Sequence, residues 1–201
     1  MVLRDGVTDH FLCACNNILI YSIGLPKDSL RGAKTMKKNN IILIGMPASG
    51  KSTVGVILAK ILGYNFVDAD IVIQKKEGRK LSQIIETEGI DGFIDIENKI
   101  NTGIECEKSV ISTGGSVVYG KEAMEHYKNI GRVIYLKVDM DILSKRLRNA
   151  KQRGVVMRKD QSLISLYNER SPLYEKYADI TIDEGKDTLE EVVARILAVL
   201  N

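Results

Sequence analysis

The chain reads Ile41-Ile42-Leu43-Ile44-Gly45-Met46-Pro47-Ala48-Ser49-Gly50-Lys51-Ser52 just before its first clear helical pattern, and this stretch decides the fold. Its leading apolar residues are typical of a buried strand, and the rest has the pattern G-x-x-x-x-G-K-S. Gly45 and Gly50 let the backbone wrap closely around an anion. Backbone N–H groups and the positive end of the next helix then point at phosphates. A glycine turn that matches by chance is the alternative, which the flanking strand and helix patterns disfavour.

The last two residues of the motif carry its chemistry. Lys51 can bring a full positive charge to the β- and γ-phosphates, and the Ser52 hydroxyl can complete the ligand shell of Mg²⁺. We therefore expect a nucleoside triphosphate and Mg²⁺ to bind here. The expected nucleotide-binding residues of this loop are Gly45, Ala48, Ser49, Gly50, Lys51, Ser52 and Thr53.

Composition narrows the class of protein. A length of 201 residues suits one α/β domain, and an apolar fraction of 44% is ample for a core. The 29 basic and 26 acidic residues leave a net charge of only +3, so charge offers no case for a nucleic-acid partner. Tryptophan is absent and aromatic residues make up 5%, so a base-stacking platform is not expected.

The spacing of the cysteines and the length of the apolar runs indicate where in the cell the protein works. Cys13, Cys15 and Cys106 have neither metal-binding spacing nor an even disulfide framework, which favours a reducing cytoplasm. No apolar run approaches the ~20 residues of a membrane span, so we expect no membrane partner.

Residues 1–35 lack the periodicity of the rest of the chain. A signal peptide is one alternative, but no small-residue cleavage site follows the apolar patch. Residues 31–35 can instead be encoded by a bacterial ribosome-binding sequence just upstream of Met36. We therefore expect translation to start at Met36, residues 1–35 to be a non-native extension without stable order, and residues 36–201 to form one domain.

From Asn40 onward, apolar strand patterns alternate with helical patterns, which is the signature of βαβ units and a parallel sheet. The patterns predict strands over 40–45, 65–68, 109–113, 132–137 and 179–182. They predict helices over 51–62, 70–77, 81–104 with an interruption near Gly89–Gly92, 120–129, 139–148, 160–177 and 187–200. We expect an α/β fold, a three-layer α/β/α sandwich with a five-stranded parallel sheet.

A basic segment without clear periodicity lies between two of the predicted helices. It covers residues 149–159 and reads Asn-Ala-Lys-Gln-Arg-Gly-Val-Val-Met-Arg-Lys. In a phosphate-binding protein, such a segment is typical of a lid that closes over phosphates. We expect a lid at about 149–160; the alternative is a solvated surface loop.

Three further elements follow the phosphate loop in order: Phe66-Val67-Asp68-Ala69-Asp70, Ser112-Thr113-Gly114-Gly115 and Arg170-Ser171-Pro172-Leu173-Tyr174. Together with the loop, they resemble the shikimate kinase family of P-loop kinases. The resemblance extends from about Asn40 to Leu200. It implies a P-loop kinase fold with a lid, with ATP and Mg²⁺ as cofactors and a small-molecule acceptor.

The resemblance gives the two acids separate roles. Asp68 matches an aspartate that helps to hold Mg²⁺ through water, and Asp70 matches the one that hydrogen-bonds the acceptor hydroxyl. A carboxylate near the γ-phosphate can orient a nucleophile and accept its proton, which suits Asp70 as a catalytic residue. The alternative for this pair is helix N-capping, which Asp70 could perform.

The resemblance also implies roles for two glycines and three arginines. Gly114 and Gly115 match glycines whose backbone approaches the acceptor; the alternative is a tight turn. Arg146 matches an arginine near the nucleotide base, and Arg153 matches a catalytic lid arginine that reaches the transferring phosphates. Arg170 matches an arginine that contacts the substrate and could bind an anion bidentately. For all three arginines, an ordinary surface position is the alternative.

The chain departs from the family pattern on the acceptor side. Ile94 stands where the family has an arginine that binds the carboxylate of shikimate, and Ile90 stands where it has an acid. Ser116 replaces the third of three glycines, and the lid reads Arg-Gly-Val-Val over 153–156 where the family has Arg-Pro-Leu-Leu. An anion would meet an apolar wall at position 94 in place of a charge-assisted bond worth about 1.5–3 kcal/mol.

The phosphate side is intact, so we predict an active ATP-dependent kinase that phosphorylates a metabolite hydroxyl, with shikimate as the acceptor. The alternatives are a paralogous kinase for another small hydroxyl compound and a nucleotide-binding pseudokinase or regulator. We expect a cytoplasmic monomer.

Overall fold

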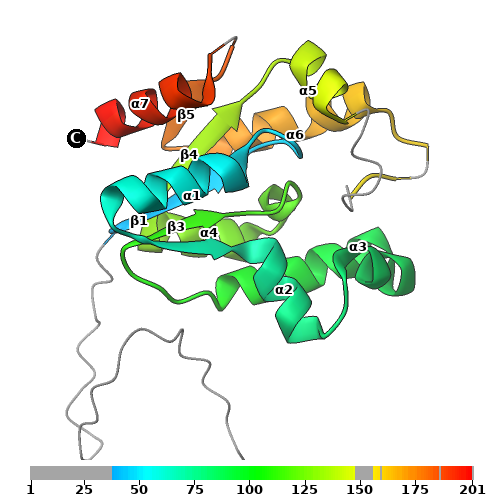
Figure 1. The fold of residues 1–201 in the computed structure, drawn as a ribbon. Helices are drawn as coiled ribbons and strands as arrows, with labels where there is room; N and C mark the ends of the chain where they lie inside the picture. The colour runs from blue at the N-terminus through cyan, green and yellow to red at the C-terminus, as the bar shows by residue number, and fades with distance from the viewer. Residues whose placement is uncertain (1–37, 148–155, 159, 186, 201) are drawn as a thin grey trace, which may run out of the picture. The chain divides into compact units, whose positions relative to one another are not determined.

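The sheet has five parallel strands in the order β2-β3-β1-β4-β5 (Figure 1). This computed structural model describes residues 38–147, 156–158, 160–185 and 187–200. Strand β1 pairs with β3 on one side and with β4 on the other, so the loop that follows β1 leaves from the middle of the sheet. The strands are β1 Asn40–Ile44, β2 Asn65–Asp68, β3 Ser109–Ser112, β4 Gly131–Lys137 and β5 Ile180–Asp183.

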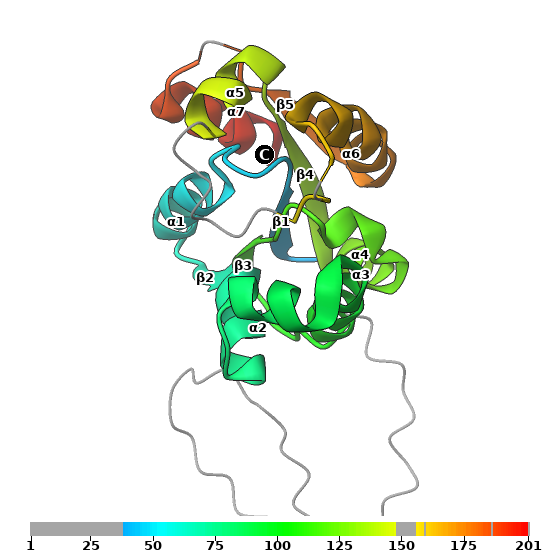
Figure 2. The ribbon, with the colours of Figure 1, turned by 90° about the vertical axis from the view of Figure 1, so that its right-hand side faces the viewer.

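Helices cover both faces of this sheet (Figures 1 and 2). Helices α1 and α7 pack on one face, and α4 and α6 pack on the other. The predicted three-layer α/β/α sandwich is therefore confirmed. The helices are α1 Lys51–Leu62, α2 Ala69–Glu77, α3 Leu81–Thr102, the 3-10 helix η1 Val117–Tyr119, α4 Lys121–Ile130, α5 Met140–Leu147, α6 Leu163–Tyr177 and α7 Leu189–Leu200.

Strand β1 shows why an unbroken apolar run forms the centre of the molecule. Ile41 and Leu43 point to the layer of α1 and α7, whereas Ile42 and Ile44 point to the layer of α4 and α6. All five residues of the strand are buried, as expected for a parallel strand covered on both faces. Each of its four apolar side chains, at positions 41–44, contributes about 1.5–3 kcal/mol by burial.

The predicted elements are confirmed, and the differences lie at their ends. The helix predicted over 160–177 begins at Leu163, because the Ser162 hydroxyl accepts a hydrogen bond from a backbone N–H of its first turn. Other predicted ends differ by one or two residues, and the short helix η1 was not predicted.

Two predictions concern residues that lie outside the described part of the chain, namely the extension at 1–35 and most of the lid at 149–160. They stay predictions. Within the described residues, no helix combines the length and apolarity that a membrane crossing requires.

Helix α3 contains the interruption that the sequence predicts. Gly89 has φ 73° and ψ −179°, which no helix allows, so α3 consists of two helical pieces joined at this residue. A side chain is strained in this conformation, and glycine is the residue that adopts it freely.

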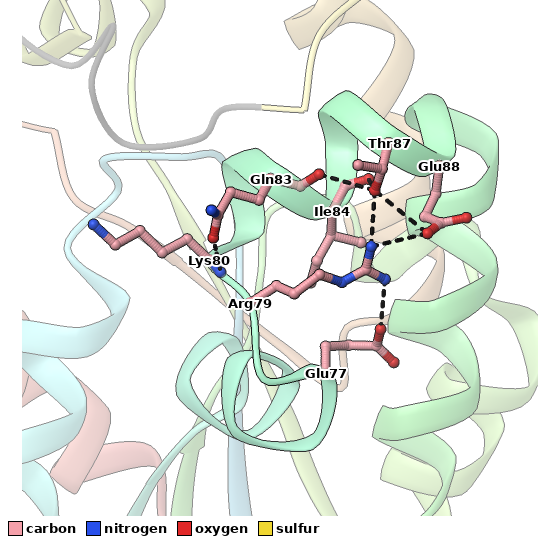
Figure 3. Close-up of polar contacts among 7 residues, drawn as sticks. All are labelled: Glu77, Arg79, Lys80, Gln83, Ile84, Thr87 and Glu88. Carbon is pink, nitrogen blue, oxygen red and sulfur yellow. Dashed lines mark hydrogen bonds and ion pairs between the residues drawn. The ribbon is translucent and has the colours of Figure 1, made fainter.

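A polar clamp around Arg79 holds the first piece of α3 against the end of α2 (Figure 3). The Arg79 guanidinium donates to the Glu77 carboxylate at 2.8 Å, to the Thr87 hydroxyl at 2.8 Å and to the Glu88 carboxylate at 3.0 Å. Thr87 and Glu88 are the last residues before the break at Gly89. The clamp therefore fixes the direction from which the second piece of α3 starts.

Beneath the clamp, α2 and α3 share a third apolar cluster, separate from the two layers of the main core. Val156, from the predicted lid segment, packs into it. Its buried residues are Ile73, Ile84, Phe93, Ile100 and Val156.

We predict that Gly89→Ala lowers the free energy of unfolding by about 1–3 kcal/mol, because it places a Cβ on a strained backbone conformation. Nothing lies within 4 Å of that Cβ, so the loss would come from the backbone alone. Urea unfolding measures it, with Gly103→Ala as the control, since Gly103 has φ −93° and a Cβ there meets only ordinary contacts. Equal losses in the two variants would contradict the prediction.

Candidate active site

The phosphate loop between β1 and α1 requires glycine for two separate reasons. Gly45 has φ 149° and Gly50 has φ 89°, both in the region that side chains avoid. A Cβ on Gly45 would also lie 2.7 Å from the backbone oxygen of Leu136 on β4. Ala48 has a positive φ of 63° as well, so the loop is held in an unusual conformation.

The Lys51 ammonium lies inside this loop. Its Nζ donates to the backbone oxygens of Gly45 and Met46, both at 2.9 Å. Lys51 is only 8% exposed, and burial lowers the pKa of its ammonium to about 8, although the nearby Asp70 carboxylate opposes the shift. A buried cation surrounded by loop backbone is suited to bind an anion.

Oxygen ligands gather beside Lys51 at the start of α1. The Ser52 hydroxyl donates to the Asp68 carboxylate at 3.2 Å and lies 3.1 Å from the Ser112 hydroxyl. Carboxylate and hydroxyl oxygens suit a hard cation such as Mg²⁺. The described residues contain no group of three or more His, Cys, Asp or Glu side chains that could hold a metal by themselves. A metal here would therefore need phosphate or water oxygens as well.

Asp68 also caps α2. Its second carboxylate oxygen accepts hydrogen bonds from the backbone N–H groups of Asp70 at 3.0 Å and Ile71 at 3.3 Å. The alternative that Asp70 caps this helix is therefore wrong, because the cap is Asp68. The Asp70 side chain is left to face the cavity described next.

One cavity of about 220 Å³ joins the phosphate loop to the residues expected at the acceptor side. Most predicted site residues line it, but Gly45, Ser49, Asp68 and Arg146 do not. Arg153 lies outside the described residues. The predicted site residues in its wall are Ala48, Gly50, Lys51, Ser52, Thr53, Asp70, Gly114, Gly115 and Arg170.

The surroundings of Asp70 raise the pKa of its carboxyl group. Burial, together with the neighbouring Asp68 carboxylate, raises the pKa of Asp70 to about 6, while the Lys51 ammonium favours the charged form. Asp70 thus shares the cavity with Lys51 as a carboxyl group whose affinity for a proton is increased.

Other side chains approach Gly114 and Gly115 too closely to leave room for a Cβ at either position. A Cβ on Gly114 would lie 2.3 Å from Glu97 Oε1 and 2.9 Å from Asp70 Oδ1. A Cβ on Gly115 would lie 2.8 Å from the Pro47 ring and 3.2 Å from Arg170 Nη1. Gly115 does lie in a turn, as the alternative expected. Neither glycine has a positive φ, however, so close approach by neighbouring groups, and not backbone conformation, is what requires glycine here.

Arg170 is a buried cation, 1% exposed, and not a surface arginine. Its Nη2 donates to the Val156 backbone oxygen at 2.7 Å, and its Nε donates to the Tyr119 hydroxyl at 3.2 Å. The guanidinium also lies over the Tyr119 ring, 5.1 Å from the centroid. Its Nη1 has no hydrogen-bond partner among the described residues. Burial of an unpaired donor is costly, so this atom is available for an anion.

Arg146 lies on the other side of the phosphate loop, beside a second cavity of about 410 Å³. Its guanidinium donates to the Ala48 backbone oxygen and to the Glu184 carboxylate, both at 3.2 Å. Burial raises the pKa of the Glu184 carboxyl, while Arg146 favours its charged form. This place agrees with the predicted position near a nucleotide base, which stays a prediction.

Sequence reasoning missed several residues of the site. Glu97 and Ser116 form a buried pair behind Gly114, and Tyr174 donates its hydroxyl proton to the Gly115 backbone oxygen at 2.5 Å. Tyr119 supports Arg170 as described above. Tyr174 and Ser116 did appear in the sequence patterns, Tyr174 in the element that contains Arg170 and Ser116 as a departure from three glycines, but neither was assigned to the site. Their contacts, like those of Glu97 and Tyr119, join residues far apart in the chain.

A phosphate loop in the middle of this parallel sheet places the protein among the P-loop kinases. The family model of shikimate kinase matches residues 47–201. The shikimate kinase of Thermodesulfovibrio yellowstonii is 38% identical over 161 residues, covering 79% of this chain and 92% of the relative. That of Pasteurella multocida is 36% identical over 169 residues, covering 82% and 97%. The chain therefore belongs to the shikimate kinase family.

Solved structures agree with this family. Shikimate kinase from Acinetobacter baumannii in complex with shikimate has a TM-score of 0.74 at 30% identity, covering 82% of this chain and 94% of that one. Shikimate kinase from Aquifex aeolicus has a TM-score of 0.69 at 35% identity, covering 80% and 95%.

We predict that Gly114→Ala lowers the free energy of unfolding by about 1–3 kcal/mol, because its methyl group overlaps Glu97 Oε1. In a Glu97→Ala background the same substitution should cost less, since the overlapping atom is gone. Urea unfolding of the two single variants and the double variant measures the coupling. Strictly additive losses would show that the two side chains do not meet.

Proposed function

We propose that this protein transfers the γ-phosphoryl group of ATP to a hydroxyl group of shikimate. The observation that carries the proposal is one cavity with Lys51 at the phosphate loop, Asp70 facing it, and the unpaired Arg170 Nη1 on the acceptor side. A hydroxyl acceptor with a carboxylate fits this arrangement, because each of its groups finds an opposite or complementary partner.

The phosphate loop would hold the triphosphate. Lys51 and the loop amides bind the β- and γ-phosphates, and Thr53 and Arg146 lie toward the nucleoside. The Ser52 hydroxyl would ligate Mg²⁺, with Asp68 behind it through water. When bound, Mg²⁺ neutralises charge that develops on the phosphate oxygens.

The acceptor side would orient the nucleophile. Asp70 accepts a hydrogen bond from the acceptor hydroxyl and takes its proton as the oxygen bonds to the γ-phosphorus, while the bond to the β-phosphate oxygen breaks and ADP leaves. Gly114 and Gly115 let the acceptor approach the backbone. Arg170 Nη1 binds the carboxylate, in place of the arginine that is absent at position 94.

The remaining assignments complete the proposal. Arg153 in the lid would reach the transferring phosphates and help to exclude water, which would otherwise hydrolyse ATP. We also propose that the protein works in the cytoplasm as a monomer, without a nucleic-acid or membrane partner.

Coupled ADP release tests the function directly. We expect turnover that requires ATP, Mg²⁺ and shikimate together. Turnover with other small alcohols but none with shikimate would contradict the acceptor, and nucleotide binding without turnover on a broad panel would contradict the reaction itself.

Lys51→Met should abolish detectable turnover and weaken MgATP binding, because it removes the ammonium inside the phosphate loop; the expected loss is several kcal/mol of transition-state stabilisation. Calorimetry with MgATP and the ADP-release assay measure the two effects. Lys60→Met is the control, since Lys60 is exposed on the same helix. A Lys51 variant that turned over normally would rule out the proposed loop chemistry.

Asp70→Asn should reduce kcat by about a hundredfold or more, because an amide cannot accept the acceptor proton. The affinity for MgATP should change little, since Asp70 is assigned to the acceptor. Steady-state kinetics and nucleotide calorimetry separate the two quantities, with Asp95→Asn on the exposed side of α3 as the control. Equal losses in kcat and nucleotide affinity would argue against this role.

A further inference from the structure

Glu97 is a buried acid without a paired cation. It lies on α3, is 1% exposed, and accepts a hydrogen bond from the Ser116 hydroxyl at 2.5 Å on Oε2. Its other oxygen, Oε1, has no hydrogen-bond partner among the described residues, and no Lys or Arg among them forms an ion pair with it. An ionised carboxylate in such a place is strongly disfavoured.

The position of Glu97 links it to the acceptor side of the cavity. Its Oε1 lies directly behind Gly114, on the same side as Asp70 Oδ1, and Arg170 Nη1 lies beside Gly115. Glu97 itself lines the cavity. Two carboxyl groups and one guanidinium therefore meet at this short glycine segment.

Two departures from the family pattern flank this acid. Ile94 is three residues before Glu97 and thus on the same face of α3, so that face offers no guanidinium. Ser116, which stands in place of a glycine, supplies the hydroxyl that Glu97 does bind. Glu97 therefore has a neutral hydrogen-bond partner, the Ser116 hydroxyl, and lacks the arginine that the family pattern would place at position 94.

The surrounding groups decide whether Glu97 carries a charge. Burial raises its pKa to about 8, and the Asp70 carboxylate on α2 acts in the same direction. The Ser116 hydroxyl, Arg170 on α6 and Lys51 on α1 favour the charged form but do not outweigh burial. On α4, the phenol of Tyr127 is buried and stays neutral, because burial raises its pKa and Glu97 adds to that shift.

We propose that Glu97 is a specificity-determining positioning residue: as a neutral acid it leaves Arg170 free to bind an anionic acceptor, and as a carboxylate it opposes that binding. With Glu97 neutral, one guanidinium and one carboxylate, Asp70, face the acceptor. With Glu97 ionised, two carboxylates face it, and a negatively charged acceptor is repelled across a few ångströms of low-dielectric cavity. This inference rests on the proposed function, because it assumes that the acceptor carries a carboxylate.

The KM for the acceptor should therefore rise with pH in the wild type, and Glu97→Gln should abolish this rise. At saturating MgATP, the KM of the wild type for shikimate should rise roughly tenfold between about pH 7 and pH 9, following ionisation of Glu97. In Glu97→Gln, which keeps an oxygen for the Ser116 hydroxyl but cannot ionise, the KM should not change across this range. Saturating nucleotide matters because it keeps Lys51 charged and removes its titration from the profile. The same profile in both proteins would overturn the proposal.

A second variant keeps the test decisive if Glu97→Gln fails to fold. Ser116→Ala removes a hydrogen bond that favours the charged form of Glu97, so the rise in KM should move to higher pH. A purely structural role of Ser116 would change KM equally at every pH. An unshifted rise would therefore contradict the proposal.

One readout does not need shikimate. The folded protein holds a proton on Glu97 that the unfolded chain releases above its ordinary pKa of 4.5. The free energy of unfolding of the wild type relative to Glu97→Gln should therefore fall as pH rises from about 5 to about 8, and be level above that. If this fall appears but shikimate gives no turnover, the proposed acceptor is wrong while the neutral acid stands. If it is absent, Glu97 is not the neutral acid.

Discussion

The meeting of β1 and β3 in the middle of the sheet is the constraint on which the rest of the site depends. The phosphate loop follows β1 and the glycine segment follows β3, so adjacent parallel strands deliver both to the same edge. Thr113 joins the two, since its backbone N–H and its hydroxyl both donate to the Leu43 backbone oxygen, at 3.2 and 2.9 Å. The strand order changes direction at β1, which is where open α/β sheets form a crevice for ligands.

This arrangement explains which parts of the site could be predicted from the sequence. The phosphate loop is a local structure, and its glycines, Lys51 and Ser52 follow one another directly. The carboxyl ends of β2 and β3 had to lie near that of β1 once a parallel sheet was recognised, so Asp68, Asp70 and the glycines could be placed in one region. The interruption at Gly89 was equally local.

The parts that could not be predicted depend on burial and on contacts between distant residues. Whether Asp68 or Asp70 caps α2 depends on side-chain orientation, and both sequence positions allow it. The burial of Arg170 requires Tyr119 and Val156, which α6 meets only in the folded protein. The protonation of Glu97 depends on how completely the surrounding helices exclude water, which no spacing in the sequence encodes. The predicted start of α6 was wrong for a local reason. The capping side chain of Ser162 sets the first residue of the helix, whereas the periodicity of the sequence alone extends the helix to earlier residues.

Arg170 connects these contacts to binding. A guanidinium has a rigid planar fork, so fixing two of its nitrogens also fixes the direction of the third. The Val156 backbone oxygen holds Nη2 and the Tyr119 hydroxyl holds Nε, which leaves Nη1 beside Gly115 with its orientation already determined. A donor oriented in advance loses little side-chain freedom when an anion arrives, so more of the interaction energy remains as affinity. Val156 in turn is buried in the apolar cluster shared by α2 and α3, so that cluster helps to fix the direction of the acceptor-side cation through the Val156 backbone oxygen.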